Sequence, residues 1–283
     1  MTGVQTCALP IYLLKVTGGI KVPAGGSDAS GAGATTTLDG SNTVDYLLHD
    51  SYYEGHTPAE QDALFSAVAH DAFQHVLSSA SSGGSAALLK AVMASTSNGH
   101  LKVWSAHADE QRHLAGSAIA GELENKPAEP AVGVYFADAT QGKMDWYLDR
   151  AVTATPVGRA SDVTARHQVH VTMRNTLSAA DVDGLPAYVS GEGASARDAA
   201  IKAGDIWTVV YVYAPAGGRL VDWTFSDGGT FDTITTHDGL TVGAKRVALA
   251  PGETFDITVN VGVSPRASGA ELEIRQTPAM RDD

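Results

Sequence analysis

Histidines are the first residues to consider, because they serve as metal ligands and as general acids or bases. Seven of the ten lie between His49 and His113, and two of these, His70 and His75, share one predicted helix. Five helical positions separate two side chains by about 140° around the axis. A shared metal ion needs a spacing of three or four, and the sequence has no His-Glu-x-x-His motif. We therefore predict no metal site, and we expect Asp71 and His75 to form an ordinary i, i+4 pair.

Motifs for nucleophilic and phosphate chemistry are also missing. The chain has no Gly-x-Ser-x-Gly elbow and no glycine-rich loop that ends in Lys-Ser or Lys-Thr. Asp227-Gly228-Gly229 followed by Asp232 misses the spacing of an EF-hand, so a turn is the favoured interpretation. Serine, histidine and aspartate are abundant, so a catalytic triad stays open. We predict no catalytic residue and no cofactor.

Aromatic residues offer a third kind of site. Exposed tyrosine and tryptophan rings could form a platform for sugar binding. At alternating positions of strands such residues are more often half-buried parts of a sheet, and this is the interpretation we favour. The candidates are Tyr52, Tyr53, Trp104, Tyr135, Trp146, Tyr147, Trp207, Tyr211, Tyr213 and Trp223.

Composition limits the class of protein. The chain has 283 residues, of which 43% are hydrophobic, and this is enough apolar material for a folded core. Its 32 acids and 19 bases give a net charge of -13, which makes nucleic acid and anionic lipid poor partners. No run of eighteen apolar residues is present, so no membrane span is predicted within this sequence.

The first eleven residues differ in character from the rest. Val4–Ile11, VQTCALPI, resembles a sequencing adapter translated in frame, and Met1–Ile11 lacks the basic start and long apolar centre of a signal peptide. We predict that residues 1–11 are an artefact in a metagenomic fragment, and that they make few contacts or pack arbitrarily. Cys7 is the only cysteine, so disulfides and cysteine-bound zinc are not expected.

Residues 12–124 read as the C-terminal part of an α/β domain. Tyr12–Pro23 predicts two strands around a Gly18-Gly19 turn, and Ala24–Ala34 predicts a flexible loop. Thr57-Pro58-Ala59-Glu60 predicts the start of a helix, with Thr57 as N-cap and Glu60 closing a capping box. The helix then carries an apolar stripe: Leu64, Phe65, Val68, Ala72, Phe73, Val76 and Leu77. Shorter elements follow: a helix from Ser85, a strand at Leu101–Trp104 and a helix at His107–Ala115.

A linker at 125–130, NKPAEP, precedes a segment dominated by apolar alternation. The predicted fold class is therefore α+β, with an antiparallel, immunoglobulin-like β-sandwich at 131–277 and a tail at 278–283. The expected inward residues are Val134, Phe136, Trp146, Val169, Val171, Val209, Val212, Phe255 and Ile257. The expected strands are His167–Asn175, Ile206–Tyr213, Leu220–Phe225, Lys245–Leu249, Thr254–Val263 and Glu271–Gln276.

A hairpin at Val132–Arg150 is the most specific feature of this segment. Val132, Val134 and Phe136 are expected to face Met144, Trp146 and Leu148 across a turn at Ala139–Gly142. The turn is framed by charges that a plain hairpin does not need, which makes its tip a candidate ligand site: Asp138, Lys143, Asp145 and Tyr147. The structural alternative is that Lys143 pairs with Asp138 or Asp145 and holds the register.

Seven stretches together resemble the C-terminal half of the domain of unknown function 4012 family. They are LKVTGGIKVP (14–23), NTVDYLLHD (42–50), YEGHTPAEQDALF (53–65), LKVWS (101–105), VGVYFADATQGKMDWYLDR (132–150), YVYAPAGGRL (211–220) and LAPGE (249–253). Proteins of that family are mostly actinobacterial and extracytoplasmic. The resemblance implies a cell-envelope protein whose membrane anchor lies in a missing N-terminal part, which would be the only contact with a membrane.

Two functions are carried forward. The leading one is a non-catalytic binding or structural module whose partner is an envelope glycan or protein. The alternative is a cell-wall glycopolymer ligase, because Asp50, Glu54 and Gln61 are similar to an acid-rich loop and helix of LytR-CpsA-Psr ligases. Those ligases hold a pyrophosphate with several arginines. Between Tyr12 and Gly116 this chain has only Arg112, so the alternative requires phosphate-binding residues in the missing N-terminal half.

Overall fold

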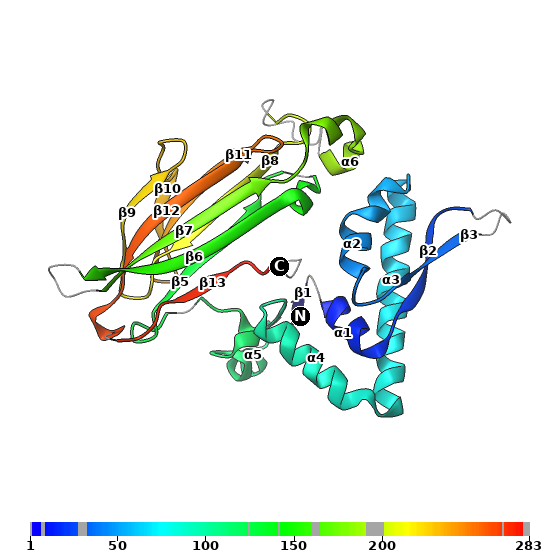
Figure 1. Ribbon diagram of the computed structural model, residues 1–283. Helices are drawn as coiled ribbons and strands as arrows, with labels where there is room; N and C mark the ends of the chain where they lie inside the picture. Colours follow the sequence, from blue (N-terminus) through cyan, green and yellow to red (C-terminus); the bar gives the residue numbers. More distant parts are fainter. Residues whose placement is uncertain are drawn as a thin grey trace. The chain divides into compact units, whose positions relative to one another are not determined.

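The computed structural model describes residues 2–6, 9–27, 33–123, 125–140, 142–159, 165–190, 201–267 and 269–279. About 35% of the chain is helix and 36% is strand, arranged in several sheets, so the chain is a mixed α+β protein as predicted. It consists of two compact units, Met1–Glu122 with Pro278–Asp283, and Leu123–Thr277. Figure 1 labels their helices and strands. No helix in the described ranges has the length and apolar character needed to cross a membrane.

The first unit combines helices with two small antiparallel sheets. β1 pairs with β4, and β2 pairs with β3. Its apolar core joins α1, β2, β3, α2 and α3 through Leu14, Val22, Leu38, Tyr46 and Leu64. The elements are β1 (Thr2–Thr6), α1 (Leu9–Thr17), β2 (Ile20–Ser27), β3 (Gly33–Leu38), α2 (Thr43–Leu48), η1 (Asp50–Tyr53), α3 (Pro58–Ser79), η2 (Ala80–Gly84), α4 (Ser85–Ser97), β4 (Leu101–Ser105), α5 (Ala108–Leu114) and η3 (Ala118–Ala120).

The start of the chain differs from the prediction in three ways. Tyr12–Thr17 belongs to helix α1 instead of a strand, because helical packing on α3 and α4 places Leu14 in the core at 1% exposure. The predicted loop is shorter, since β2 extends to Ser27 and β3 begins at Gly33, and residues 28–32 lie outside the described ranges. Thr2–Thr6 pairs along its whole length with β4, so the expectation of few contacts is wrong there, while the alternative expectation of arbitrary packing stays a prediction. Such pairing uses backbone groups, which any sequence supplies.

The start of α3 confirms the predicted capping box. The Thr57 Oγ1 accepts a hydrogen bond from the backbone N–H of Glu60 at 3.4 Å, and Glu60 Oε2 accepts one from the N–H of Thr57 at 2.8 Å. The apolar stripe is only partly buried. Leu64, Val68 and Ala72 are in the core, whereas Phe73 is 60% exposed, so the buried stripe is narrower than predicted.

The second unit contains two sheets. One has the order β10-β11-β8-β5-β13 and is antiparallel except that β13 runs parallel to β5; the other has the order β6-β7-β12-β9 and is antiparallel. Neither closes into a barrel. Short helical segments connect strands of this unit: η4 (Met144–Tyr147), η5 (Ala179–Gly184), α6 (Ala187–Ser190) and η6 (Pro265–Ala267). The strands are β5 (Ala131–Asp138), β6 (Leu148–Arg159), β7 (Ala165–Asn175), β8 (Ile206–Tyr213), β9 (Arg219–Phe225), β10 (Thr233–His237), β11 (Leu240–Leu249), β12 (Thr254–Gly262) and β13 (Glu273–Gln276).

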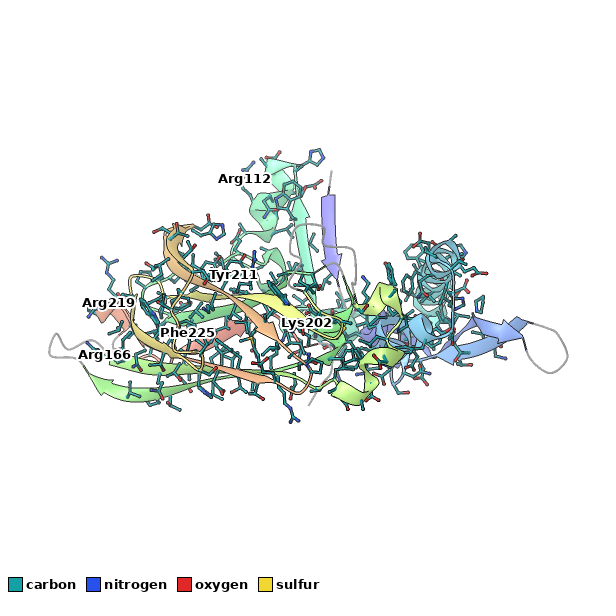
Figure 2. All side chains as sticks on the ribbon, turned by 90° about the horizontal axis from the view of Figure 1, so that it is seen from above. Arg112, Arg166, Lys202, Tyr211, Arg219 and Phe225 are labelled. Carbon is teal, nitrogen blue, oxygen red and sulfur yellow. The ribbon has the colours of Figure 1, made fainter. Side chains whose placement is uncertain are left out.

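Each sheet buries one face. Val210 and Val212 of β8 are fully buried, and so are Val169 and Val171 of β7. Side chains also meet between the sheets: the guanidinium of Arg150 lies 4.7 Å from the ring centre of Phe136, and Lys245 Nζ lies 5.5 Å from that of Phe225. Figure 2 labels Tyr211 and Phe225, one from each sheet. Val209, predicted to point inward, lies on the opposite face from Val210, because neighbouring residues of a strand alternate between faces.

The predicted hairpin at Val132–Arg150 is wrong. β5 pairs with β8 and β13, whereas β6 pairs with β7 in the other sheet. Met144–Tyr147 forms the 3₁₀ turn η4 instead of a strand, and it buries Met144 at 1% exposure. The turn redirects the chain from one sheet to the other, so apolar residues on both sides of it fill one interior without facing each other in a ladder.

Candidate functional site

Two of the four predicted tip residues, Asp138 and Asp145, interact electrostatically. Asp138 ends β5, and its Oδ1 accepts hydrogen bonds from the N–H and the hydroxyl of Thr140 at 2.7 and 2.8 Å. Asp145 lies in η4. Burial by surrounding atoms, together with the charge of Asp138, raises the pKa of Asp145 to about 6, while the positive charge of Arg150 opposes this rise. Asp145 is nevertheless exposed to solvent, which screens its charge and limits the effect of this shift on stability.

Lys143 and Tyr147 make different contacts. The backbone N–H of Lys143 donates to the carbonyl oxygen of Val189 at 2.8 Å, and its Nζ lies 5.8 Å from the ring centre of Tyr188. Among the described residues Lys143 forms no ion pair with Asp138 or Asp145. The alternative in which such a pair holds the strand register is therefore not observed. The carbonyl of Tyr147 accepts from the N–H and hydroxyl of Thr176 at 2.8 and 3.0 Å. The four tip residues therefore divide into an acidic pair, Lys143 beside Tyr188, and Tyr147, whose carbonyl bonds to Thr176.

The raised pKa of Asp145 predicts a pH effect. The folded chain holds this proton more tightly than the unfolded chain, whose carboxyl titrates near 3.8. The contribution of Asp145 to the free energy of unfolding therefore falls as the pH rises from about 4 to about 6 and stays lower above that range. Asp145→Asn removes this titration, so we expect the variant to gain stability relative to the parent at pH above about 6 and not at pH about 4. Melting temperatures of both chains across this range test it, and parallel curves would contradict it.

The outward face of the five-stranded sheet carries a row of aromatic side chains, which we call the aromatic face: Tyr135, Trp207, Tyr211 and Tyr213. On β8, Trp207, Tyr211 and Tyr213 alternate with the buried Thr208, Val210 and Val212. The register places Tyr135 of β5 directly opposite Tyr211. All four side chains are half-buried, as the favoured interpretation requires, yet they point away from the core, as a sugar platform requires.

A glycine sets the position of Tyr135. A Cβ atom at Gly133 would lie 2.7 Å from Cε2 of the Tyr135 ring and 3.2 Å from Cβ of Tyr213, so only glycine leaves room for this ring. The rings of Tyr135 and Tyr213 meet edge to face with centres 5.7 Å apart. The Tyr213 hydroxyl lies 2.9 Å from Nδ1 of His237 in β10. Burial raises the pKa of both tyrosines, so both stay protonated at neutral pH.

Trp207 occupies the other end of the aromatic face. The guanidinium of Arg246 in β11 lies 6.0 Å from its ring centre. The indole Nε1 is enclosed and has no hydrogen-bond partner among the described residues. Solvent therefore reaches other atoms of Trp207 and not its indole N–H. The accessible part of this side chain is better suited to stacking on a ligand than to hydrogen bonding with one.

The outward face of the four-stranded sheet has no such row of aromatic side chains among the described residues. Among the described residues its outward positions, on the face opposite Val171 and Ile257, are mostly polar, with Ala151 as an exception, and they carry no aromatic ring other than His170. One row of register partners across the four strands consists of Thr153, His170, Thr258 and Thr224. Antiparallel sheets usually present such a polar face to water. The aromatic face departs from this rule and needs an explanation of its own.

The residues that resemble a ligase loop, Asp50, Glu54 and Gln61, bond to other residues of the first unit. Gln61 Nε2 donates to the buried hydroxyl of Ser51 at 2.9 Å, and Glu54 Oε2 lies 2.9 Å from the Tyr46 hydroxyl and 3.0 Å from His56 Nε2. Asp50 Oδ1 lies 2.8 Å from His49 Nδ1. Arg112 pairs with Asp109 on its own helix α5. These contacts stabilise local turns and assemble no cluster of cations.

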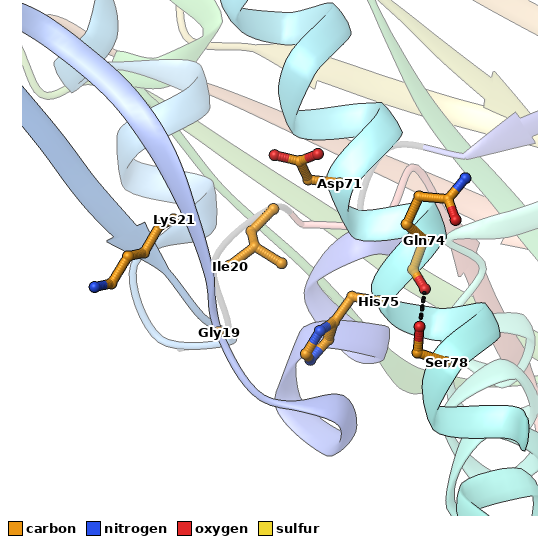
Figure 3. A pocket seen from close by; sticks show the side chains of 7 residues that line it. All are labelled: Gly19, Ile20, Lys21, Asp71, Gln74, His75 and Ser78. Atoms are coloured by element: carbon orange, nitrogen blue, oxygen red, sulfur yellow. Dashed lines mark hydrogen bonds between the residues drawn. The ribbon is translucent and has the colours of Figure 1, made fainter. Parts of the chain in front are cut away.

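An open groove of about 400 Å³ lies between the start of β2 and the C-terminal half of α3 (Figure 3). Its lining includes Lys21, Asp71 and Gln74. His75 also borders it, but its Nε2 bonds to the carbonyl of Thr17 at 2.6 Å, and the predicted pair with Asp71 is absent from the described residues. In the parts of the chain that the structure describes, no three His, Cys, Asp or Glu side chains are placed to hold a metal ion.

Comparison with known proteins does not assign the chain to a family. No family model, no curated protein and no solved structure matches it. The resemblance to the domain of unknown function 4012 family therefore stays a prediction, and proposals about function depend on the geometry of the chain's own residues.

Proposed function

We propose that this chain is part of a non-catalytic binding protein of the cell envelope, whose second unit binds an envelope glycan through the aromatic face. The resemblance described above supports an extracytoplasmic location, with the membrane anchor outside this sequence. We also propose an immunoglobulin-like arrangement of the second unit. Two sheets with one buried face each, joined by side-chain contacts such as Arg150 with Phe136, support it.

The observation that carries the glycan proposal is the outward position of Trp207, Tyr211, Tyr213 and Tyr135. Aromatic rings on a solvent-facing sheet expose apolar surface, and exposing this surface to water costs free energy. A ligand that covers the rings removes that cost. Sugar rings have apolar faces edged by hydroxyls. They can stack on Trp207 and Tyr211 while tyrosine hydroxyls and His237 exchange hydrogen bonds with them.

A pull-down with insoluble cell-wall material from an actinobacterium tests this proposal. We expect the full chain to bind, and the double variant Trp207→Ala with Tyr211→Ala to bind about tenfold or more weakly, a loss of about 1.4 kcal/mol or more. Trp104→Ala is the matched control, because Trp104 is an exposed tryptophan of β4 in the other unit at 55% exposure. Circular dichroism spectra must coincide for all chains. Equal binding by the double variant and the parent would overturn the proposal.

A further inference from the structure

We infer that the groove between β2 and α3 binds an extended peptide segment, which lies beside β2 as a third strand and places a basic side chain against Asp71. This inference concerns the first unit and is independent of the glycan proposal for the second. Three features carry it: the free edge of β2, the acidic character of α3, and the length of the polar row along that helix.

One edge of β2 is free. Among the described strands β2 pairs only with β3, with Lys21 opposite Thr37 and Pro23 opposite Thr35. The N–H and C=O groups of a residue in such a ladder point to the same edge of the strand, and successive residues alternate between the two edges. Pro23 has no N–H to give to β3, and its carbonyl accepts a hydrogen bond of 3.5 Å from the Tyr46 hydroxyl of α2. Pro23 therefore points away from β3, and so does Lys21, two residues earlier.

The groove lies along this free edge. Its lining combines Gly19, Ile20 and Lys21 with residues of α3 and includes no residue of β3. In the described part of the chain, the main-chain N–H and C=O of Lys21 have no partner outside the β2–β3 ladder. Unpaired strand edges bind extended peptides through main-chain hydrogen bonds, and neighbouring side chains supply the specificity.

The helix that forms the other wall is acidic. α3 carries Glu60, Asp62 and Asp71 and no lysine or arginine. Asp71 lines the groove and is half-buried, and its carboxylate has no hydrogen-bond or ion-pair partner among the described residues. Figure 3 shows Asp71 on the side of α3 that faces β2, whereas the Lys21 side chain points away from the helix. A lysine or arginine of the bound segment can therefore pair with Asp71 without approaching the Lys21 ammonium group.

The polar row on α3 sets the length of the segment. Asp71, Gln74 and Ser78 line the groove at spacings of three and four residues, which places them on one side of the helix. The row extends about 10 Å along the helix axis, which equals about three residues of an extended strand. The groove volume of about 400 Å³ likewise suits a short segment, since it lies near the lower end of the range for ligand sites.

Selection of a displayed library of random seven-residue peptides on the full chain tests this inference. We expect the enriched peptides to share a lysine or arginine at one position. The best of them, made as a free peptide, should bind Asp71→Asn about tenfold or more weakly than the parent. Asp62→Asn is the matched control, because Asp62 is exposed and lies nine residues from Asp71, which is about 180° around the helix. It should bind like the parent.

N-methylation of the peptide backbone tests strand pairing. A peptide that lies beside one strand uses the N–H groups of every second residue. We expect methyl groups on one alternate set of amides to abolish detectable binding, and methyl groups on the other set to leave binding nearly unchanged. A peptide bound as a helix or turn would not show this alternation.

The inference is wrong if the selection enriches no peptide, if the enriched peptides bind Asp71→Asn like the parent, or if the two N-methylated sets bind equally. It is also wrong if the chain sediments as a dimer that excludes the peptide, because a second copy then occupies the edge. Circular dichroism spectra must coincide for parent and variants. None of these outcomes alters the glycan proposal, which depends on Trp207 and Tyr211 in the other unit.

Discussion

Asn175→Ala is expected to lower the free energy of unfolding of the Leu123–Thr277 unit by about 3 kcal/mol or more. Asn175 ends β7 and is completely buried. Its Nδ2 donates to the carbonyls of Gly204 and Leu249 at 2.8 and 3.1 Å, and its Oδ1 accepts from the N–H of Leu177 at 3.0 Å. Alanine would leave two buried carbonyls and one buried N–H without a partner, and each such group costs about 1–3 kcal/mol.

Denaturant unfolding followed by tryptophan fluorescence measures this effect in the right unit, because Trp146, Trp207 and Trp223 belong to the second unit and only Trp104 to the first. Asn125→Ala is the control. Its Nδ2 donates to the carbonyl of Asp238 in an exposed hydrogen bond, so a loss below about 1 kcal/mol is expected. Equal losses for the two variants would show that the Asn175 network is not the source of stability we assign to it.

Gly218→Ala is expected to be similarly damaging, for a steric reason. A Cβ atom at Gly218 would lie 2.2 Å from the carbonyl oxygen of Gly262 and 2.9 Å from that of Pro215. Both neighbours are backbone atoms, and Gly262 is held in β12 by pairing with β7 and β9. The Gly262 carbonyl cannot move without disturbing the β12 ladder, and the Pro215 carbonyl accepts a turn hydrogen bond from the N–H of Gly218 at 2.8 Å. We therefore expect a loss of about 3 kcal/mol, at the upper end of the range for overpacking.

Gly184→Ala is the control for this second variant, because a Cβ atom there would meet nothing within 4 Å. Melting by scanning calorimetry should show the transition of the second unit at a clearly lower temperature for Gly218→Ala and almost unchanged for Gly184→Ala. A wild-type melting curve for Gly218→Ala would mean that the turn before β9 has more room than these distances allow.

Most of the second unit's strands could be predicted from alternation. β8 begins and ends at the predicted residues, Ile206 and Tyr213, and β7 and β12 differ from the predicted strands by only a few residues. Apolar residues at every second position have one stable solution, a strand with one buried face, whatever its partner. β10 was not predicted because Thr233–His237 has no apolar alternation and every residue in it is exposed.

The candidate site was only partly predictable. The charges and the Tyr147 ring at 138–147 are visible in the sequence, but their separation into an acidic pair and a contact of Lys143 with Tyr188 depends on α6, which comes from a distant segment. The aromatic face was visible only as scattered rings. Its members come from β5 and β8, and the pairing of Tyr135 with Tyr211 cannot be read from either strand alone.

Local signals in the sequence were sufficient wherever the interacting groups are close in the chain. The capping box of Thr57 and Glu60 spans three residues, and its hydrogen bonds form in any context that allows the helix. The division of β5 and β6 between two sheets was decided by tertiary structure, as was the helical state of Tyr12–Thr17. In both cases the apolar pattern fits more than one local structure, and the free energy of burying Met144 and Leu14 in a core built from distant segments selects one of them.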